Sequence, residues 1–261
     1  MPENCPSGKM NLEQRLHDVA ERVRAAERQF GRQPGSVQIL PVSKTRPAED
    51  IAAVADLAIA GMGQAFGENY LQEAVDKIAA LAKRNLQWHF IGPIQSNKTA
   101  LIAQQFDWVH SVDRMKIAQR LNDQRPVELP ALNICLQVNV SAETSKSGIT
   151  LEELPALAEK VAQLPRLQLR GLMAIPAASA NPVAQRAAFH EVREAFNRLK
   201  NPQDREGCLG SWRYWDTLSM GMSGDLEMAI AEGATIVRIG TDIFGPRLSH
   251  AETVAEAATK T

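Results

Sequence analysis

Two periods of apolar and polar residues follow one another along this chain, and they predict helices and strands in turn. The first period is helical: Asn11 and Gln14 have the spacing of a capped helix start, and apolar residues then recur on one face. Those apolar residues are Leu16, Val19, Ala20 and Val23. The helical pattern fades at Gly31 and Pro34, and a short apolar run at residues 37–44 predicts the first strand.

Seven further apolar runs predict strands, and Ala-, Glu- and Lys-rich stretches between them predict helices. The runs lie at residues 63–66, 87–91, 108–112, 132–140, 167–173, 216–219 and 235–239. Residues 71–83 and 151–164 are typical of helices, and Thr150 with Glu153 forms a capping box for the second. From Val37 onward, the chain predicts a series of eight strand–helix units.

This series determines the expected architecture. Strands that alternate with helices pair in parallel through right-handed crossovers, and eight units in ~220 residues match a closed (β/α)8 TIM barrel with an extra N-terminal helix. An open flavodoxin-like or Rossmann sheet is the alternative. Because no linker or charge block divides the chain, we expect one barrel domain at residues 11–248. Residues 1–10 and 249–261 are expected to be flexible tails.

The composition narrows the class of function. The chain has 261 residues, 29 Lys and Arg against 30 Asp and Glu, and a hydrophobic fraction of 44%. A net charge of −1 argues against nucleic-acid binding, and the longest uncharged stretch is too short to span a membrane. The first residues lack the apolar core of a signal peptide, and Cys5, Cys135 and Cys208 form no CxxC pair. We expect a soluble, reduced, cytoplasmic protein without a metal.

The candidate chemistry lies at the C-terminal ends of the strands, where barrels of this kind place their active sites. Lys44 ends the first strand, and a lysine there forms a Schiff base if its amine is neutral. A solvated or ion-paired lysine is the alternative role, and Lys146, after the fifth strand, is the alternative lysine. Arg238 lies in an apolar strand, so its guanidinium needs a core carboxylate, an aromatic nitrogen or a phosphate as partner.

The last two units have the pattern of a phosphate site, because barrels often bind phosphate at the loops after strands seven and eight. Ser223 is expected to cap a helix, and Gly240 with Thr241 introduces a short helical turn. A lysine, a phosphate cradle and a buried arginine together suggest pyridoxal 5′-phosphate (PLP) as cofactor. A sugar-phosphate aldolase is the alternative, and it leaves Arg238 unexplained.

Eight short motifs follow one another between residues 42 and 245. They are Val42-Ser-Lys-Thr45, Phe66-Gly-Glu-Asn-Tyr70, Trp88-His-Phe-Ile-Gly-Pro-Ile-Gln-Ser-Asn-Lys98, Gln137-Val-Asn-Val-Ser141, Ser145-Lys-Ser-Gly148, Arg170-Gly-Leu-Met-Ala-Ile-Pro176, Leu218-Ser-Met-Gly-Met-Ser223, and Val237-Arg-Ile-Gly-Thr241 with Ile243-Phe-Gly245. In this order the chain resembles the pyridoxal phosphate homeostasis protein family, which is related in fold to the barrel domain of bacterial alanine racemase. The resemblance covers nearly the whole chain.

This resemblance implies which residues bind the cofactor. Lys44 would hold PLP as a Schiff base, and Arg238 would face the ring nitrogen. The implied phosphate ligands are Ser219 or Ser223 with the backbone of Gly240 and Thr241, and the implied further pocket residues are Asn69, His89 and Asn139. The chain departs from the family pattern in a longer segment between Lys44 and Phe66, at Gly224, and at Asp242, whose charge would weaken phosphate binding if it pointed inward.

The resemblance also implies a function in vitamin B6 homeostasis without strong turnover, with PLP-dependent apo-enzymes as recipients of PLP. A protonated Arg238 would leave the pyridine nitrogen unprotonated, which makes PLP a weaker electron sink. A PLP-dependent amino-acid racemase is the alternative. Racemisation needs a base on each face of the cofactor. The chain has only two tyrosines that could serve as the second base, Tyr70 and Tyr214, and no second domain is expected to supply one. We also expect a monomer.

Overall fold

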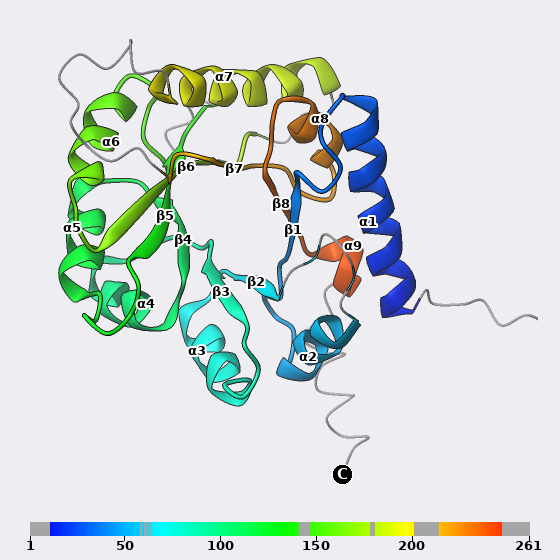
Figure 1. The fold of residues 1–261 in the computed structure, drawn as a ribbon, viewed down its shortest axis with the longest axis horizontal. Coiled ribbons are helices and arrows are strands. Elements are labelled where there is room, and N and C mark those ends of the chain that lie inside the picture. Colours follow the sequence, from blue (N-terminus) through cyan, green and yellow to red (C-terminus); the bar gives the residue numbers. More distant parts are fainter. Residues whose placement is uncertain are drawn as a thin grey trace, which may run out of the picture.

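The computed structural model describes residues 11–57, 59, 62, 64–140, 147–177, 181–200 and 214–246. The predicted tails at 1–10 and 249–261, Cys5, Cys208 and the alternative lysine Lys146 lie outside these residues. Strands and helices alternate along the described chain, and the helices surround the strands (Figure 1). Within the described ranges, no helix is both long and apolar enough to cross a bilayer.

The strands form one parallel sheet in the order β1-β8-β7-β6-β5-β4-β3-β2. Their bounds are β1 Gln38–Pro41, β2 Ala65–Glu68, β3 Gln87–Phe90, β4 Trp108–Val112, β5 Leu132–Val138, β6 Leu167–Ala174, β7 Thr217–Ser219 and β8 Ile236–Ile239. Beyond the end of β1, Val42 bridges Gly67 of β2 in parallel, and the Ser43 N–H donates to the Gly67 carbonyl at 3.0 Å. This seam brings the two edges of the sheet together, so the predicted TIM barrel is confirmed.

The helices cover the outside of the strands. Their bounds are α1 Leu12–Gln29, α2 Ala48–Leu57, α3 Leu71–Ala80, α4 Thr99–Gln105, α5 Met115–Gln124, α6 Leu154–Ala162, α7 Pro182–Lys200, α8 Leu226–Ala231 and α9 Thr241–Phe244, with a 3-10 turn η1 at Ser96–Lys98. The extra N-terminal helix α1 is confirmed, and the Asn11 side chain accepts from the Gln14 N–H at 2.7 Å as predicted. The buried face of α1 packs against α8 and α9 (Figure 1).

Alternation along the strands separates an outer apolar layer from the barrel interior. On β8, Val237 and Ile239 belong to the large core between strands and helices, whereas Ile236 belongs to a small inner cluster with Leu40 and Val42 of the first unit. Because successive side chains point to opposite faces of a strand, Arg238 shares the inward face of Ile236. Strand β2 runs from Ala65 to Glu68, whereas the prediction was residues 63–66. Gly67 and Glu68 therefore belong to this strand.

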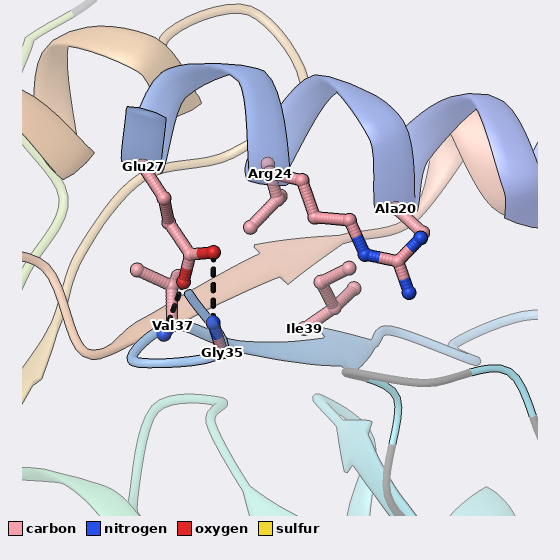
Figure 2. Close-up of a pocket in the computed structure, with 7 residues that line it drawn as sticks. Ala20, Arg24, Glu27, Gly35, Val37 and Ile39 are labelled. Atoms are coloured by element: carbon pink, nitrogen blue, oxygen red, sulfur yellow. Dashed lines mark hydrogen bonds between the residues drawn. The ribbon is translucent and has the colours of Figure 1, made fainter. Parts of the chain in front are cut away.

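The loop that leads from α1 into β1 is held by one buried carboxylate. Glu27 is 1% exposed and accepts from the N–H groups of Gly35 and Val37, each at 2.9 Å (Figure 2). The carboxylate thus satisfies two backbone donors where the chain reverses direction between helix and strand. The glycine at 35 has φ +77, a backbone angle that favours glycine in this turn.

We expect Glu27→Ala to lower the free energy of unfolding by about 3 kcal/mol, because two N–H groups would lose a charged acceptor inside the protein. Urea denaturation monitored by circular dichroism measures the change. Glu21→Ala on the exposed face of the same helix is the matched control, and we expect it to be nearly neutral because the Glu21–Arg28 pair is solvent-exposed. Equal destabilisation by both variants would contradict the clamping role of Glu27.

Candidate functional site

A cavity of about 240 Å³ opens at the C-terminal ends of the first, second and eighth strands. Residues that the sequence analysis singled out contribute much of its lining: Lys44, Asn69, Ser223, Arg238, Gly240 and Thr241. Val42, Ile91, Ile175, Met222 and Gly224 complete it. The barrel therefore gathers residues from six strand–helix units around one space, at the end of the barrel where such folds place their sites.

Lys44 reaches this cavity because it follows the inward-facing side of β1. Leu40 and Val42 belong to the inner apolar cluster, and Lys44 lies two residues beyond Val42. Its side chain is half-buried, so the amine lies between protein and solvent. The amine thus shares one cavity with apolar side chains and with the Arg238 guanidinium.

Two loops provide the polar side of the cavity. Gly240 is the N-cap residue of α9, and the first N–H groups of a helix have no acceptor within the helix. The prediction that Ser223 caps a helix is wrong: α8 has Asp225 at its N-cap position. The Asp225 carboxylate accepts from the Met222 N–H and closes a turn there, so the helix begins only at Leu226 and Ser223 stays in the loop.

Helix α1 ties both loops together through Arg22. Its guanidinium donates to the Ser223 carbonyl at 3.1 Å, to Glu227 at 2.9 Å and to Asp242 at 2.6 Å. Asp242 therefore pairs with Arg22, and it does not line the cavity. The Asp242 carboxylate, one of the departures from the family pattern, is thus neutralised by Arg22 of α1. Its expected weakening of phosphate binding is therefore reduced.

Arg238 lines the cavity from inside the barrel and is 4% exposed. Nη1 donates to the carbonyl and the hydroxyl of Ser219, at 2.6 and 2.8 Å, and Nη2 donates to the Ala174 carbonyl at 3.0 Å. Its partners within the described chain are thus neutral, and the core carboxylate considered from the sequence is not among them. Burial lowers the pKa of Arg238 to about 10, opposed by the nearby charge of Asp225, so the guanidinium stays protonated at neutral pH.

Below Arg238, a line of polar side chains begins at the buried Ser219, continues through the buried His110 and His89, and ends at the exposed Gln87. Ser219 Oγ lies 2.8 Å from His110 Nδ1, His110 Nε2 lies 2.9 Å from His89 Nδ1, and His89 Nε2 lies 3.0 Å from Gln87 Oε1. Burial lowers the pKa of His89 to about 3 and that of His110 well below its usual value, so both rings are neutral.

Because both rings are neutral, the hydrogen bonds along this line can be donated in one direction only. An amide oxygen only accepts, so His89 donates from Nε2 to Gln87, His110 donates from Nε2 to His89, and the Ser219 hydroxyl donates to His110. The Ser219 oxygen then presents its lone pairs to Arg238. Ser219 and His89 thus support Arg238 from below and do not line the cavity.

His110 is a residue that sequence reasoning missed. Its signal was the two-residue spacing from Trp108 in the fourth strand, which places both side chains on the inward face. Asn139 also does not line the cavity; its N–H donates to the Ile149 carbonyl at the end of β5. These placements divide the predicted residues into those that line the cavity and those that lie around it.

Asn69 and Tyr70 mark the boundary with a second cavity. Asn69 lines both spaces, and its Oδ1 is buried with no hydrogen-bond partner among the described residues. Tyr70 lines only the second space, of about 350 Å³, and its side chain is half-exposed. Of these two residues, only Asn69 lines the cavity that contains Lys44.

The comparisons with known proteins agree with this geometry. The family model described as "Alanine racemase, N-terminal domain" matches residues 15–247. The pyridoxal phosphate homeostasis protein of Pseudomonas aeruginosa is 58% identical over 90% of this chain and 96% of that protein, and that of Escherichia coli K12 is 52% identical over 89% and 95%. The structure of PipY from Synechococcus elongatus PCC7942 with PLP bound has a TM-score of 0.74 and 33% identity, and the match covers 90% of this chain and 100% of that one. This chain therefore belongs to the pyridoxal phosphate homeostasis protein family, within the wider family of the alanine racemase N-terminal domain.

Proposed function

We propose that this protein binds PLP in the 240 Å³ cavity, covalently through Lys44, and serves vitamin B6 homeostasis in the cytoplasm. It holds the cofactor and hands it over to PLP-dependent apo-enzymes, with little turnover of its own. One observation carries the proposal: Lys44, the loop at Ser223, the N-cap glycine of α9 and the buried Arg238 line the same cavity. The names of the relatives and the PLP bound to PipY support it.

The donors and acceptors around the cavity fit this cofactor. When bound, PLP would supply an aldehyde carbon to which the Lys44 amine could attach covalently. The Ser223 hydroxyl and the N–H groups of Gly240 and Thr241 would hold the phosphate, and Arg238 would donate to the ring nitrogen.

The surroundings of Arg238 favour binding over turnover. Its three hydrogen bonds to Ser219 and Ala174 fix the guanidinium in the charged form, which donates and cannot accept. A ring nitrogen facing it stays unprotonated, so the cofactor withdraws fewer electrons from a bound substrate. The neighbouring histidines do not compensate, because both are neutral and engaged with each other.

The test of this function is spectroscopic. The purified protein is mixed with PLP, its absorbance is recorded in the visible range before and after borohydride, and the reduced protein is digested and mapped. We expect a band that borohydride removes, with the label on Lys44. A protein that binds no PLP, or binds it without any reducible link, would refute the proposal and leave the aldolase reading open.

We expect Arg238→Gln to change the spectrum of bound PLP more than the amount bound. The proposed phosphate ligands belong to Ser223, Gly240 and Thr241, so the substitution leaves them in place. The residue that would face the ring nitrogen, however, loses its positive charge. Titration with PLP, followed by absorbance across pH, separates the two effects. Loss of all binding with an unchanged circular dichroism spectrum would instead identify Arg238 as a phosphate ligand.

A further inference from the structure

A cluster of charged side chains outside the barrel wall, two buried and one partly exposed, contacts the residues on either side of Lys44. It consists of Lys77 and Glu73 on α3 and Glu68 at the end of β2. We propose that these three are positioning residues, which fix the backbone at residues 43–45 so that the Lys44 side chain enters the cavity. The inference rests on the proposed function, because it assigns a role toward the same lysine.

Lys77 is the centre of the cluster. Its side chain is buried, although lysines are rarely so, and an ammonium group has three protons to donate. Nζ donates to the Ser43 carbonyl at 2.7 Å, to Glu68 Oε1 at 2.8 Å and to Glu73 Oε1 at 2.5 Å. One donated bond thus goes directly to the residue before Lys44, and the other two go to the carboxylates.

Both carboxylates reach the same short segment. The Ser43 hydroxyl donates to Glu68 Oε1 at 2.7 Å, and the Thr45 N–H donates to Glu73 Oε1 at 2.6 Å. The Ser43 N–H is already held by the Gly67 carbonyl in the seam between β1 and β2. The peptide groups before and after Lys44 are therefore fixed from α3 and from β2.

The backbone itself shows that this fixing is required. Thr45 has φ 62, and it is the one non-glycine residue with a positive φ in the described chain. A β-branched residue rarely adopts this conformation, which persists only where its surroundings impose it. Thr45 lies in a turn in which the Arg46 N–H donates to the Ser43 carbonyl at 3.0 Å, and the bond from the Thr45 N–H to Glu73 holds this turn from α3.

The cluster is also costly for stability. Burial raises the pKa of Glu68, and its Oε2 has no hydrogen-bond partner in the described structure. A buried ion pair contributes little net stability compared with apolar residues of similar size. Burying this cluster costs free energy, and the cluster contacts both neighbours of Lys44. Its role is therefore explained better by the positioning of the Lys44 side chain than by stabilisation of the fold.

The experiment compares attachment of PLP with binding of a matched analogue. Apo protein is mixed with PLP, and the borohydride-reducible link to Lys44 is followed with time by absorbance and peptide mapping. In parallel, the affinity for 4′-deoxypyridoxine 5′-phosphate is measured, because this analogue keeps the ring and phosphate and lacks the aldehyde. The variants are Lys77→Met and Glu73→Ala, and Lys83→Met just after α3 is the exposed control.

If the cluster positions Lys44, attachment slows by about 100-fold in Lys77→Met, the size expected when a reacting group is displaced by about 1 Å. Attachment is also slower in Glu73→Ala, whereas Lys83→Met attaches PLP at the wild-type rate. Affinity for the analogue stays close to that of the wild type throughout. Glu73 is partly exposed, so its variant provides the answer if Lys77→Met does not fold.

Two results would overturn the positioning role. One is attachment at the wild-type rate in the variants; the other is a parallel loss of attachment and analogue binding, which indicates a structural role alone. In both, the wild type still forms the Lys44 link and the proposed function stands. A wild type without that link refutes the proposed function instead, and the positioning role with it.

Discussion

Lys44→Ala is expected to abolish the borohydride-reducible visible band while the barrel stays folded. The substitution removes the amine that forms the link, and the side chain contributes nothing to the apolar cores. The phosphate loops and Arg238 remain, so the variant is expected to retain weak, non-covalent PLP binding. Absorbance with and without borohydride, together with circular dichroism, measures both parts of this expectation.

Two further lysines make this test specific. Lys77 is buried with its amine engaged by three acceptors, so we expect no label on it. Lys83→Ala, at an exposed position just after α3, is the matched control and should keep the wild-type band. A persistent band in Lys44→Ala with the label on Lys146 would transfer the Schiff-base role to that lysine.

We expect the protein to fall short of enzymatic racemisation by about 10²–10⁴-fold, the usual contribution of one positioned acid–base group. Lys44 provides one base, and the opposite face of the cofactor needs a second within hydrogen-bond reach. Tyr70 lines the neighbouring cavity and not that of Lys44. His89 is buried, lies outside the cavity lining, and has its pKa lowered to about 3 by burial.

The assay is incorporation of solvent deuterium at Cα of alanine and other common amino acids, with chiral analysis of the products. Wild type, Lys44→Ala and Tyr70→Phe are compared, and the last serves as the matched control for a mobile tyrosine. Slow exchange in all three supports a carrier of PLP. Fast, Lys44-dependent exchange with inversion, reduced in Tyr70→Phe, would establish a racemase.

Much of the fold and part of the site could be predicted from local sequence pattern. The spacing of apolar residues gave the N-terminal helix and the strand–helix alternation, and a parallel closed barrel follows from that alternation. The position of Lys44 and Arg238 near strand ends then placed both at the same end of the barrel. These predictions succeeded because each depends on residues that are neighbours in the chain.

Contacts between distant segments decided the rest. Arg22 and Asp242 are 220 residues apart, His110 and Ser219 are 109 apart, and Lys77 lies 34 residues beyond Ser43. Each pair meets only because of strand register and helix packing, and no local pattern shows which surface charge will find a partner. Ser223 illustrates the same limit at short range, since the turn closed by Asp225 displaced the predicted helix start.

By itself, the sequence determined the architecture, and it indicated the end of the barrel and the lysine at which we propose that PLP binds. The tertiary structure decided which residues line the cavity, which lie behind it, and what holds Arg238 and Lys44 in place. The physical reason is that periodicity is a property of successive residues, whereas a binding site is made of side chains that share a small volume. Closure of the sheet between β1 and β8 on one side, and β1 and β2 on the other, brings those side chains together.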